Sequence, residues 1–366
     1  MMENKAGSPE ANHLLFFGAY DPGYPRNLII RKGWLKSGFT LSECRVGVKR
    51  KVHTRYPALL FRYMKSRRLG RILFVPDFRH KDVPLAWALA RLTGKKVIFD
   101  PLVSRYETKV LDRGDAGEDS VQAWHNRNLD RISFNLPDLV LADTAAHAAF
   151  YHESLGVDRE RIGVVPVGFD EETFRPVPQR REDGTLALLF YGSFLPLHGV
   201  TTIVEAASAL VDRPIRFRIV GEGQTHAEAR RLAEIRRLEK VHFLPPVPYA
   251  ELHRLIAESD VVLGIFGTTR KASMVVPNKV YQALAVGRPV VTAGTPAIGE
   301  FFDAGEHLMT VPPGDAEALA AAIRALESDR GLRFHLADTG GSYVRSTFDS
   351  ASIAGRLHDI IEEMDL

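Results

Sequence analysis

Short apolar runs alternate with longer segments whose apolar positions recur at helical spacing along most of this chain. In the second half, this alternation predicts strands at Leu186–Tyr191, Ile215–Val220, Val241–Leu244, Val261–Phe266 and Pro289–Thr292, with helices at Thr201–Leu210, His226–Leu238 and Tyr249–Glu258. Strands and helices that alternate in this way form a parallel sheet covered on both faces. The pattern therefore predicts a doubly wound α/β domain, whose ligands lie at the carboxyl ends of the strands.

The first half of the chain has the same alternation, with strands expected at Leu14–Gly18, Ile72–Val75, Lys96–Phe99 and Leu139–Ala142. A strand and a glycine turn at Arg161–Asp170 close this half, and the polar, proline-containing stretch Arg175–Gly184 is typical of a linker. The expected architecture is α/β, with two Rossmann-like doubly wound domains that face each other across a cleft. Ser350–Met364 is predicted to be an amphipathic helix.

The most informative run is Val276–Val291. Pro277 stands where a helix would begin, Gly287 where it would end, and Pro289 prevents its continuation. The first turns of this helix carry three polar side chains, Asn278, Lys279 and Gln282. Because a helix N-terminus attracts anions, the run can be a clamp for the diphosphate and ribose of a nucleotide. An ordinary α/β crossover explains the same residues, and the run alone does not decide between the two.

Composition narrows the class of protein. The 366 residues suffice for two domains, and the single cysteine, Cys44, excludes an intrachain disulfide and favours a reducing, cytoplasmic compartment. We expect neither a transmembrane helix nor a signal peptide, and we expect the polar stretch Met1–Asn12 to be disordered. His residues are scattered without the spacing of metal ligands, and no Asp-x-Asp motif occurs.

The net charge of +3 is unevenly distributed, because ten Lys and Arg residues and no Asp or Glu lie between Arg45 and Arg71. Apolar residues such as Phe61 and Met64 are interleaved with them. Three interpretations remain open: a patch that binds an anionic membrane surface, a pocket for an acidic acceptor, or a solvated helix face. Nucleic acid is the least favoured partner, since no nucleic-acid module accompanies the charge.

Six motifs, taken in order, resemble the family 4 retaining glycosyltransferases, which have the GT-B fold. They are Gly18–Asn27, Ile162–Asp170, Tyr191–Gly199, Val220–Gly223, Phe243–Leu252 and Val276–Val291. The resemblance implies an acceptor domain over residues 1–172, completed by a returning helix at 346–366, and a donor domain over 173–345. It also implies that a sugar moves from a nucleoside diphosphate donor, most often a UDP-sugar, to a hydroxyl of a sugar, a lipid-linked or a small-molecule acceptor. No metal or other cofactor is expected, and the expected location is the cytoplasm or the inner face of a membrane.

The same resemblance assigns a donor site, in which Gln282 holds the ribose in place of the family's Glu, and Met274 stands at the other Glu position. Where many relatives carry Arg and Lys in the first donor loop, this chain has Ser193 and His198, so Lys271, Lys279 and Arg26 become candidates to bind the phosphates. The full set of expected donor residues is Gly192, Ser193, His198, Gly199, Gly221, Val247, Lys271, Val276, Asn278, Lys279 and Gln282.

On the acceptor side, the first loop contributes Asp21, Tyr24 and Arg26. Asp100 takes the place of a family His near the reaction centre, where it could stabilise positive charge or orient a hydroxyl; it could equally cap the next turn. His80 is expected to point toward the cleft, or else to be a structural His. Two other functions fit the same fold, a sugar-nucleotide epimerase and an inactive nucleotide-sugar-binding partner.

Overall fold

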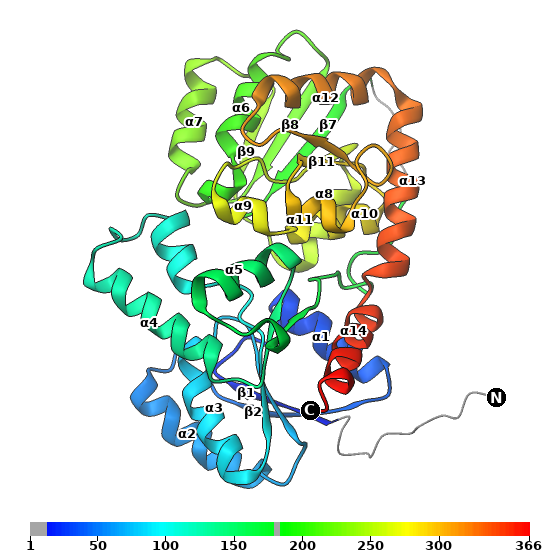
Figure 1. The fold of residues 1–366 in the computed structure, drawn as a ribbon. Coiled ribbons are helices and arrows are strands. Elements are labelled where there is room, and N and C mark those ends of the chain that lie inside the picture. The colour runs from blue at the N-terminus through cyan, green and yellow to red at the C-terminus, as the bar shows by residue number, and fades with distance from the viewer. Residues whose placement is uncertain (1–12, 179–183) are drawn as a thin grey trace, which may run out of the picture. The chain divides into compact units, whose positions relative to one another are not determined.

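The computed structural model describes residues 13–178 and 184–366, which form two compact units. One unit comprises Met1–Gly168 with Ser350–Leu366, and the other comprises Phe169–Asp349 (Figure 1). The disorder expected for Met1–Asn12 and the middle of the expected linker, residues 179–183, lie outside the described residues.

The first unit is built on a parallel sheet in the order β2-β1-β3-β4-β5-β6. Its strands are β1 (His13–Gly18), β2 (Thr40–Arg45), β3 (Ile72–Val75), β4 (Lys96–Phe99), β5 (Leu139–Ala142) and β6 (Ile162–Val164). The chain turns from one side of the sheet to the other between β1 and β3, which are hydrogen-bonded neighbours. In doubly wound sheets, such a switch point is where ligands bind.

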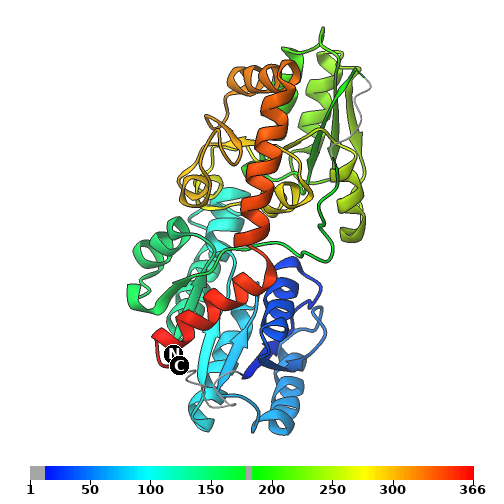
Figure 2. The ribbon, with the colours of Figure 1, turned by 90° about the vertical axis from the view of Figure 1, so that its right-hand side faces the viewer.

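Helices cover both faces of this sheet (Figure 1). The helices are α1 (Pro25–Lys36), α2 (Val52–Ser66), α3 (Val83–Thr93), α4 (Val121–Asn135), α5 (Ala145–Leu155) and α14 (Ser350–Glu363), with short turns η1 (His80–Asp82), η2 (Glu107–Asp112) and η3 (Arg159–Arg161). α1 and α14 pack against each other, as Figure 2 makes visible for the red and dark blue helices. The backbones meet so closely that a Cβ on Gly33 would lie 1.8 Å from the carbonyl oxygen of Ser350. The expected return of the last helix to the first domain is thus confirmed.

The second unit holds a second parallel sheet, in the order β12-β11-β10-β7-β8-β9. Its strands are β7 (Leu186–Tyr191), β8 (Ile215–Val220), β9 (Val241–Leu244), β10 (Val261–Leu263), β11 (Val290–Ala293) and β12 (Met309–Val311). Here the switch point lies between β7 and β10, which pair in parallel. Two doubly wound parallel sheets confirm the α/β fold class predicted from the sequence.

The helices of the second unit are α6 (Val200–Ser208), α7 (His226–Ile235), α8 (Leu252–Ala257), α9 (Arg270–Met274), α10 (Asn278–Val286), α11 (Pro296–Phe301), α12 (Ala316–Ser328) and α13 (Arg330–Thr347), with turns η4 (Pro196–His198) and η5 (Tyr249–Glu251). α6 packs with α7 and α12, whereas α10 packs with α8 and α13. A core of aliphatic and aromatic side chains, including Leu188, Phe190 and Ile219, fills the space between the sheet and helices α6, α7 and α12.

Candidate functional site

The switch point of the second sheet is occupied by the ammonium group of Lys279. Lys279 lies in the first turn of α10, and its Nζ is 3.4 Å from the carbonyl oxygen of Gly264, directly after β10. The same Nζ lies 3.8 Å from the ring centroid of Phe190 in β7. A Cβ on Gly192, which follows β7, would be 3.3 Å from it. A buried cation therefore stands between the carboxyl ends of β7 and β10, where this kind of sheet binds ligands.

The helix that carries Lys279 also points its N-terminus at this edge. Pro277 provides no side-chain cap for α10, and Gly287 ends the helix in the left-handed conformation with φ 84°. Burial holds the pKa of the Lys279 ammonium well below its usual value. A cation at a helix N-terminus is also disfavoured by the helix dipole. Both costs would be offset by a bound anion, so the arrangement is suited to phosphate.

His198 and Lys271 join Lys279 at this edge. Burial, and then the charges of Lys279 and Lys271, hold the pKa of His198 well below its usual value, so the imidazole is neutral at physiological pH. Its Nδ1 contacts the carbonyl oxygen of Ser193. Lys271 is itself buried in α9. The structure thus brings together three side chains that the sequence assigned to the donor site.

Glycines let the loops at this edge approach each other without side chains between them. Gly221 has φ 136°, and a Cβ there would lie 1.9 Å from the carbonyl oxygen of Gly192. Gly199, at φ 60°, would place a Cβ 2.5 Å from the carbonyl carbon of Phe266. At these two positions the backbones approach so closely that only glycine fits.

The remaining expected donor residues differ in accessibility. Gln282 is buried, and its Oε1 accepts a hydrogen bond of 2.8 Å from the hydroxyl of Tyr191. Val276 and Met274 are buried in the core, whereas Asn278 is half-buried at the start of α10. Val247 is also half-buried, next to the exposed Pro246. The Oε1 atom of Gln282 is therefore already hydrogen-bonded to another residue of the protein, Tyr191.

In the first unit, Arg26 and Asp100 have a different role from the expected one. The Arg26 guanidinium donates two hydrogen bonds to Asp100, Nε to Oδ2 at 2.8 Å and Nη2 to Oδ1 at 3.2 Å, and two more to the carbonyl oxygens of Val165 and Pro166. Both side chains are fully buried. Arg26 was expected to bind phosphate, and Asp100 to stabilise positive charge, orient a hydroxyl or cap the next turn; in this structure the two buried side chains bind each other.

His80 is likewise a core residue. It is 1% exposed, its Nε2 lies 2.9 Å from the carbonyl oxygen of Val103, and its ring packs against Phe99 and Phe134. Burial, together with the charge of Arg105, lowers the pKa of His80 to about 3. A neutral imidazole enclosed by aromatic rings corrects the expectation that His80 faces a cleft.

The first loop, in contrast, reaches the surface. Asp21 is exposed, and its Oδ1 accepts a hydrogen bond from the N–H of Gly23 at 2.9 Å. Tyr24 is half-buried, with its ring 5.1 Å from that of Phe78. Burial, followed by Asp77 and Asp100, raises the pKa of the Tyr24 phenol.

Sequence reasoning missed Asp77, which follows β3 at the switch point of the first sheet. Its carboxyl group is buried, and Oδ1 has no hydrogen-bond partner among the described residues. Burial, and then the neighbouring Asp100, raise the pKa of Asp77 to about 7. The signal that could have found it is its place as the first polar residue after β3.

The basic segment divides into structural and exposed cations. Arg55 is buried and pairs with Asp82 at 2.9 Å. On α2 and just after it, Arg62, Lys65, Arg67 and Arg68 are exposed, beside the exposed apolar side chains of Leu60, Phe61, Met64 and Leu69. Within the residues that the structure describes, no helix has both the length and the apolar character to cross a membrane.

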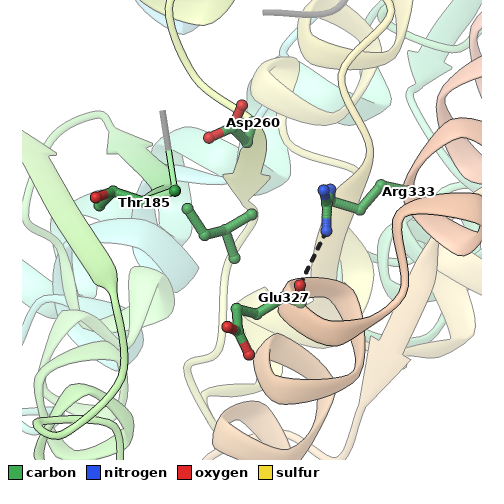
Figure 3. Close-up of a pocket in the computed structure, with 6 residues that line it drawn as sticks. Thr185, Asp260, Glu327 and Arg333 are labelled. Carbon is green, nitrogen blue, oxygen red and sulfur yellow. Dashed lines mark hydrogen bonds between the residues drawn. The ribbon is translucent and has the colours of Figure 1, made fainter. Parts of the chain in front are cut away.

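A pocket in the second unit lies away from this edge. It is lined by Gly184, Thr185, Leu186, Asp260, Glu327 and Arg333 (Figure 3). Leu186 begins β7 and Asp260 precedes β10, so the pocket is at the amino ends of the strands. In the described part of the chain, no three His, Cys, Asp or Glu side chains are grouped as metal ligands would be.

Solved structures share the fold of this chain over nearly its whole length. HepE of Anabaena, in a structure described as a complex with UDP and glucose, matches with a TM-score of 0.71 at 15% identity, over 96% of this chain and 99% of that one. A sucrose-phosphate synthase from Thermosynechococcus elongatus matches with a TM-score of 0.74 at 15% identity, over 96% and 98%. The fold of the chain is therefore the GT-B fold.

Within the second unit, residues 185–329 match the family model described as Glycosyl transferases group 1. WcaL of Escherichia coli, named for colanic acid biosynthesis, is 30% identical over 184 residues, which cover 48% of this chain and 45% of WcaL. A D-inositol 3-phosphate glycosyltransferase of Pseudarthrobacter chlorophenolicus is 30% identical over 208 residues, 53% of this chain and 48% of that protein. The chain thus aligns with about half the length of these relatives.

Proposed function

We propose that the protein transfers a sugar from a nucleoside diphosphate donor, a UDP-sugar in the first instance, to a hydroxyl of an acceptor. The observation that carries the proposal is the buried ammonium of Lys279 at the β7/β10 switch point. UDP and UDP-glucose are named with the structures of HepE, whose fold this chain shares. The family of residues 185–329 supports the same class of reaction.

The chemical step needs a site that stabilises the charge of the departing diphosphate. Lys279 can supply a positive charge with little competing water, because it is buried. The N-terminus of α10 adds N–H donors at the same place, and Lys271 adds a second cation. These groups support catalysis without a metal ion, and retention at the anomeric carbon is proposed from the resemblance to family 4.

The exposed cations and apolar side chains of α2 suggest where the protein works. Lys and Arg near an anionic bilayer each contribute about 1 kcal/mol of attraction, and aromatic and aliphatic side chains can enter the interface. We propose that α2 and the residues after it hold the protein at the cytoplasmic face of such a membrane, where a lipid-linked acceptor would be presented. The buried thiol of Cys44 is compatible with a reducing compartment.

Two steps test the function. In the first, thermal unfolding is measured with UDP, GDP, ADP and uridine; we expect the largest rise in Tm with UDP and little with uridine, since a ligand of the folded state stabilises it. In the second, UDP-glucose, UDP-galactose and GDP-mannose are incubated with methyl glycosides and with inositol 3-phosphate, and products are identified by NMR. A new glycoside with the donor's anomeric configuration supports the proposal. Conversion of the donor into another nucleotide sugar without acceptor would indicate an epimerase, and nucleotide binding without any reaction an inactive partner.

A further inference from the structure

The first sheet has its own switch point, between β1 and β3, and the residues after these two strands meet there. The loop after β1 brings Asp21 and Tyr24, and the loop after β3 brings Asp77. Open α/β sheets bind ligands in the crevice outside the carboxyl ends at this point. Asp100, which the sequence favoured, lies one strand further along, after β4.

The two carboxyl groups differ in what they can bind. Both oxygens of Asp100 accept hydrogen bonds from the guanidinium of Arg26, which is itself buried. Asp77 is 3% exposed, and its Oδ1 has no hydrogen-bond partner among the residues that the structure describes. A buried polar atom without a partner is costly, and native proteins keep few of them outside functional sites. The unused hydrogen-bonding capacity of the pair therefore belongs to Asp77.

The backbone holds Asp77 against Asp100 tightly. The N–H of Asp100 donates to the carbonyl oxygen of Val75 at 3.0 Å, and the N–H of Phe78 donates to that of Pro101 at 3.3 Å. Phe78 and Leu102 adopt left-handed conformations, with φ 61° and φ 60°, which cost energy for side chains of this size. The loops after β3 and β4 are thus fixed in a geometry that sequence preference alone would not select.

A second unpartnered polar group is buried in the first unit. Tyr151 of α5 is fully buried, and its hydroxyl has no hydrogen-bond partner in the described chain. Burial, and then the charges of Asp143 and Asp100, raise the pKa of this phenol well above its usual value. The free carboxylate oxygen of Asp77 is an acceptor for a hydroxyl group, so this edge suits a neutral polyhydroxyl compound.

We propose that Asp77 receives the hydrogen bond of the reacting hydroxyl of a neutral polyhydroxyl acceptor, at the β1/β3 switch point of the first unit. The inference rests on the proposed transferase function and adds to it a positioning and specificity residue. Asp77 orients the hydroxyl oxygen, and it binds best as the ionised carboxylate, since a charged acceptor forms the stronger hydrogen bond.

The charges around Asp77 set the pH at which its carboxyl group ionises and binds the acceptor hydroxyl best. Burial and Asp100 raise its pKa to about 7, while Arg79, Arg26 and a hydrogen bond from Asn27 act in the opposite direction. Tyr24, the other titratable neighbour, stays protonated because burial, and then Asp77 and Asp100, raise its pKa. We therefore expect the KM for the acceptor to fall as the pH rises through about 7.

The test compares wild type with Asp77→Asn, which keeps the shape and removes the charge. Transfer from UDP-glucose is measured with methyl glycosides and inositol 3-phosphate over a range of pH. We expect the KM for the glycoside used to rise about tenfold or more in Asp77→Asn, with a flat pH profile and an unchanged Kd for UDP. Asp77→Glu should recover part of the loss. Asp138→Asn is the matched control: it removes another carboxylate of the first sheet, one that accepts a hydrogen bond from the Val97 N–H at the amino end of β4.

The outcomes separate the two proposals. If the wild type transfers no sugar to any of these acceptors, the transferase function fails for this donor and acceptor set, whatever the variants do. If the wild type transfers and Asp77→Asn has the same acceptor KM and pH profile, the assignment of Asp77 is overturned. A better turnover with inositol 3-phosphate than with the neutral glycosides would overturn the preference for a neutral acceptor.

Discussion

Arg26 binds Asp100 through two parallel hydrogen bonds, of 2.8 Å and 3.2 Å, and both side chains are buried. The other hydrogen bonds of the guanidinium go to the carbonyl oxygens of Val165 and Pro166. Arg26 thereby connects α1 with the ends of β4 and β6. The pair stabilises the carboxyl edge of the first sheet rather than a substrate.

We expect Asp100→Asn to lower the free energy of unfolding by roughly 3–5 kcal/mol, because it leaves a buried guanidinium without its charged partner. Urea denaturation measures this change. Arg91→Gln breaks a more exposed pair with Asp138, of 3.6 Å, and should change stability by less than about 1 kcal/mol. A stable Asp100→Asn variant that loses only sugar transfer would restore the catalytic interpretation.

Lys279→Met is expected to weaken UDP binding about tenfold to a hundredfold while uridine binding stays the same, since we propose that the lysine binds phosphate and not the base. Without ligand, the variant should have a higher Tm at neutral pH, because it removes a buried cation whose pKa is lowered by desolvation. Isothermal titration calorimetry and thermal unfolding give the two values. In wild type, stability should rise with pH, since the folded state binds fewer protons at Lys279 than the unfolded chain does.

Lys240→Met is the control for this experiment. Lys240 donates hydrogen bonds to the carbonyl oxygens of Val211 and Arg213, next to the amino end of β9. Its loss should leave UDP affinity unchanged. Equal loss of UDP binding in both variants would mean that Lys279 acts only through stability.

Asp77 should make wild type less stable as the pH rises from about 4 to about 7. Its pKa is near 3.8 in the unfolded chain and about 7 in the folded protein, so over this window the folded state holds a proton that the unfolded state has lost. Asp77→Asn should therefore flatten this part of the curve of Tm against pH, and it should be the more stable protein at pH above 7. A lower Tm for Asp77→Asn throughout would contradict a raised pKa.

The contact between α1 and α14 offers a test with two glycines. Gly33→Ala places a Cβ 1.8 Å from the Ser350 carbonyl oxygen, so we expect severe destabilisation or loss of soluble protein. Gly355 lies in α14, and a Cβ there has no atom within 4 Å. Gly355→Ala should therefore raise the free energy of unfolding by about 0.5–1 kcal/mol. Deletion of 350–366 should have the effect of Gly33→Ala. Similar Tm values for the two alanine variants would be evidence against this helix packing.

The membrane proposal predicts that the protein sediments with vesicles that contain anionic lipid and not with neutral vesicles, and that binding weakens as salt rises. Replacement of Arg62, Lys65, Arg67 and Arg68 by Glu should abolish sedimentation and leave UDP binding intact. Replacement of Arg230, Arg231, Arg236 and Arg237, all exposed on and beside α7, by Glu gives the same change in net charge at another surface and is the control. Sedimentation that survives the first replacement, or is lost in the second, would assign the interaction elsewhere.

Several strands have the limits that the sequence predicts, including the partly exposed strands Ile215–Val220 and Val241–Leu244. Leu186–Tyr191 and Ile72–Val75 have the expected limits because every residue in them is buried. The edge strand Thr40–Arg45 was missed, since only Cys44 in it is buried and its polar residues give no apolar run. Tyr249–Glu258, predicted as one helix, is a short turn followed by α8.

Contacts between residues far apart in the sequence limited how much of the site could be predicted. The position of Lys279 could be predicted, because Pro277 and the residues after it mark the start of α10 locally in the sequence. Arg26 and Asp100 could not, because they are 74 residues apart and nothing local indicates that they bind each other. Asp77 was missed for a similar reason, as its unusual pKa comes from burial and from Asp100 on the next strand.

The glycine-lined edge of the second sheet restricts how this protein can evolve. A side chain at Gly221 would displace the loop of Gly192, and one at Gly199 would displace the backbone of Phe266, so neither position can accept mutations one at a time. The loop at Pro246 and Val247, in contrast, is exposed or half-buried and can change freely. Related sequences should therefore vary at the Pro246–Val247 loop and keep glycine at positions 199 and 221.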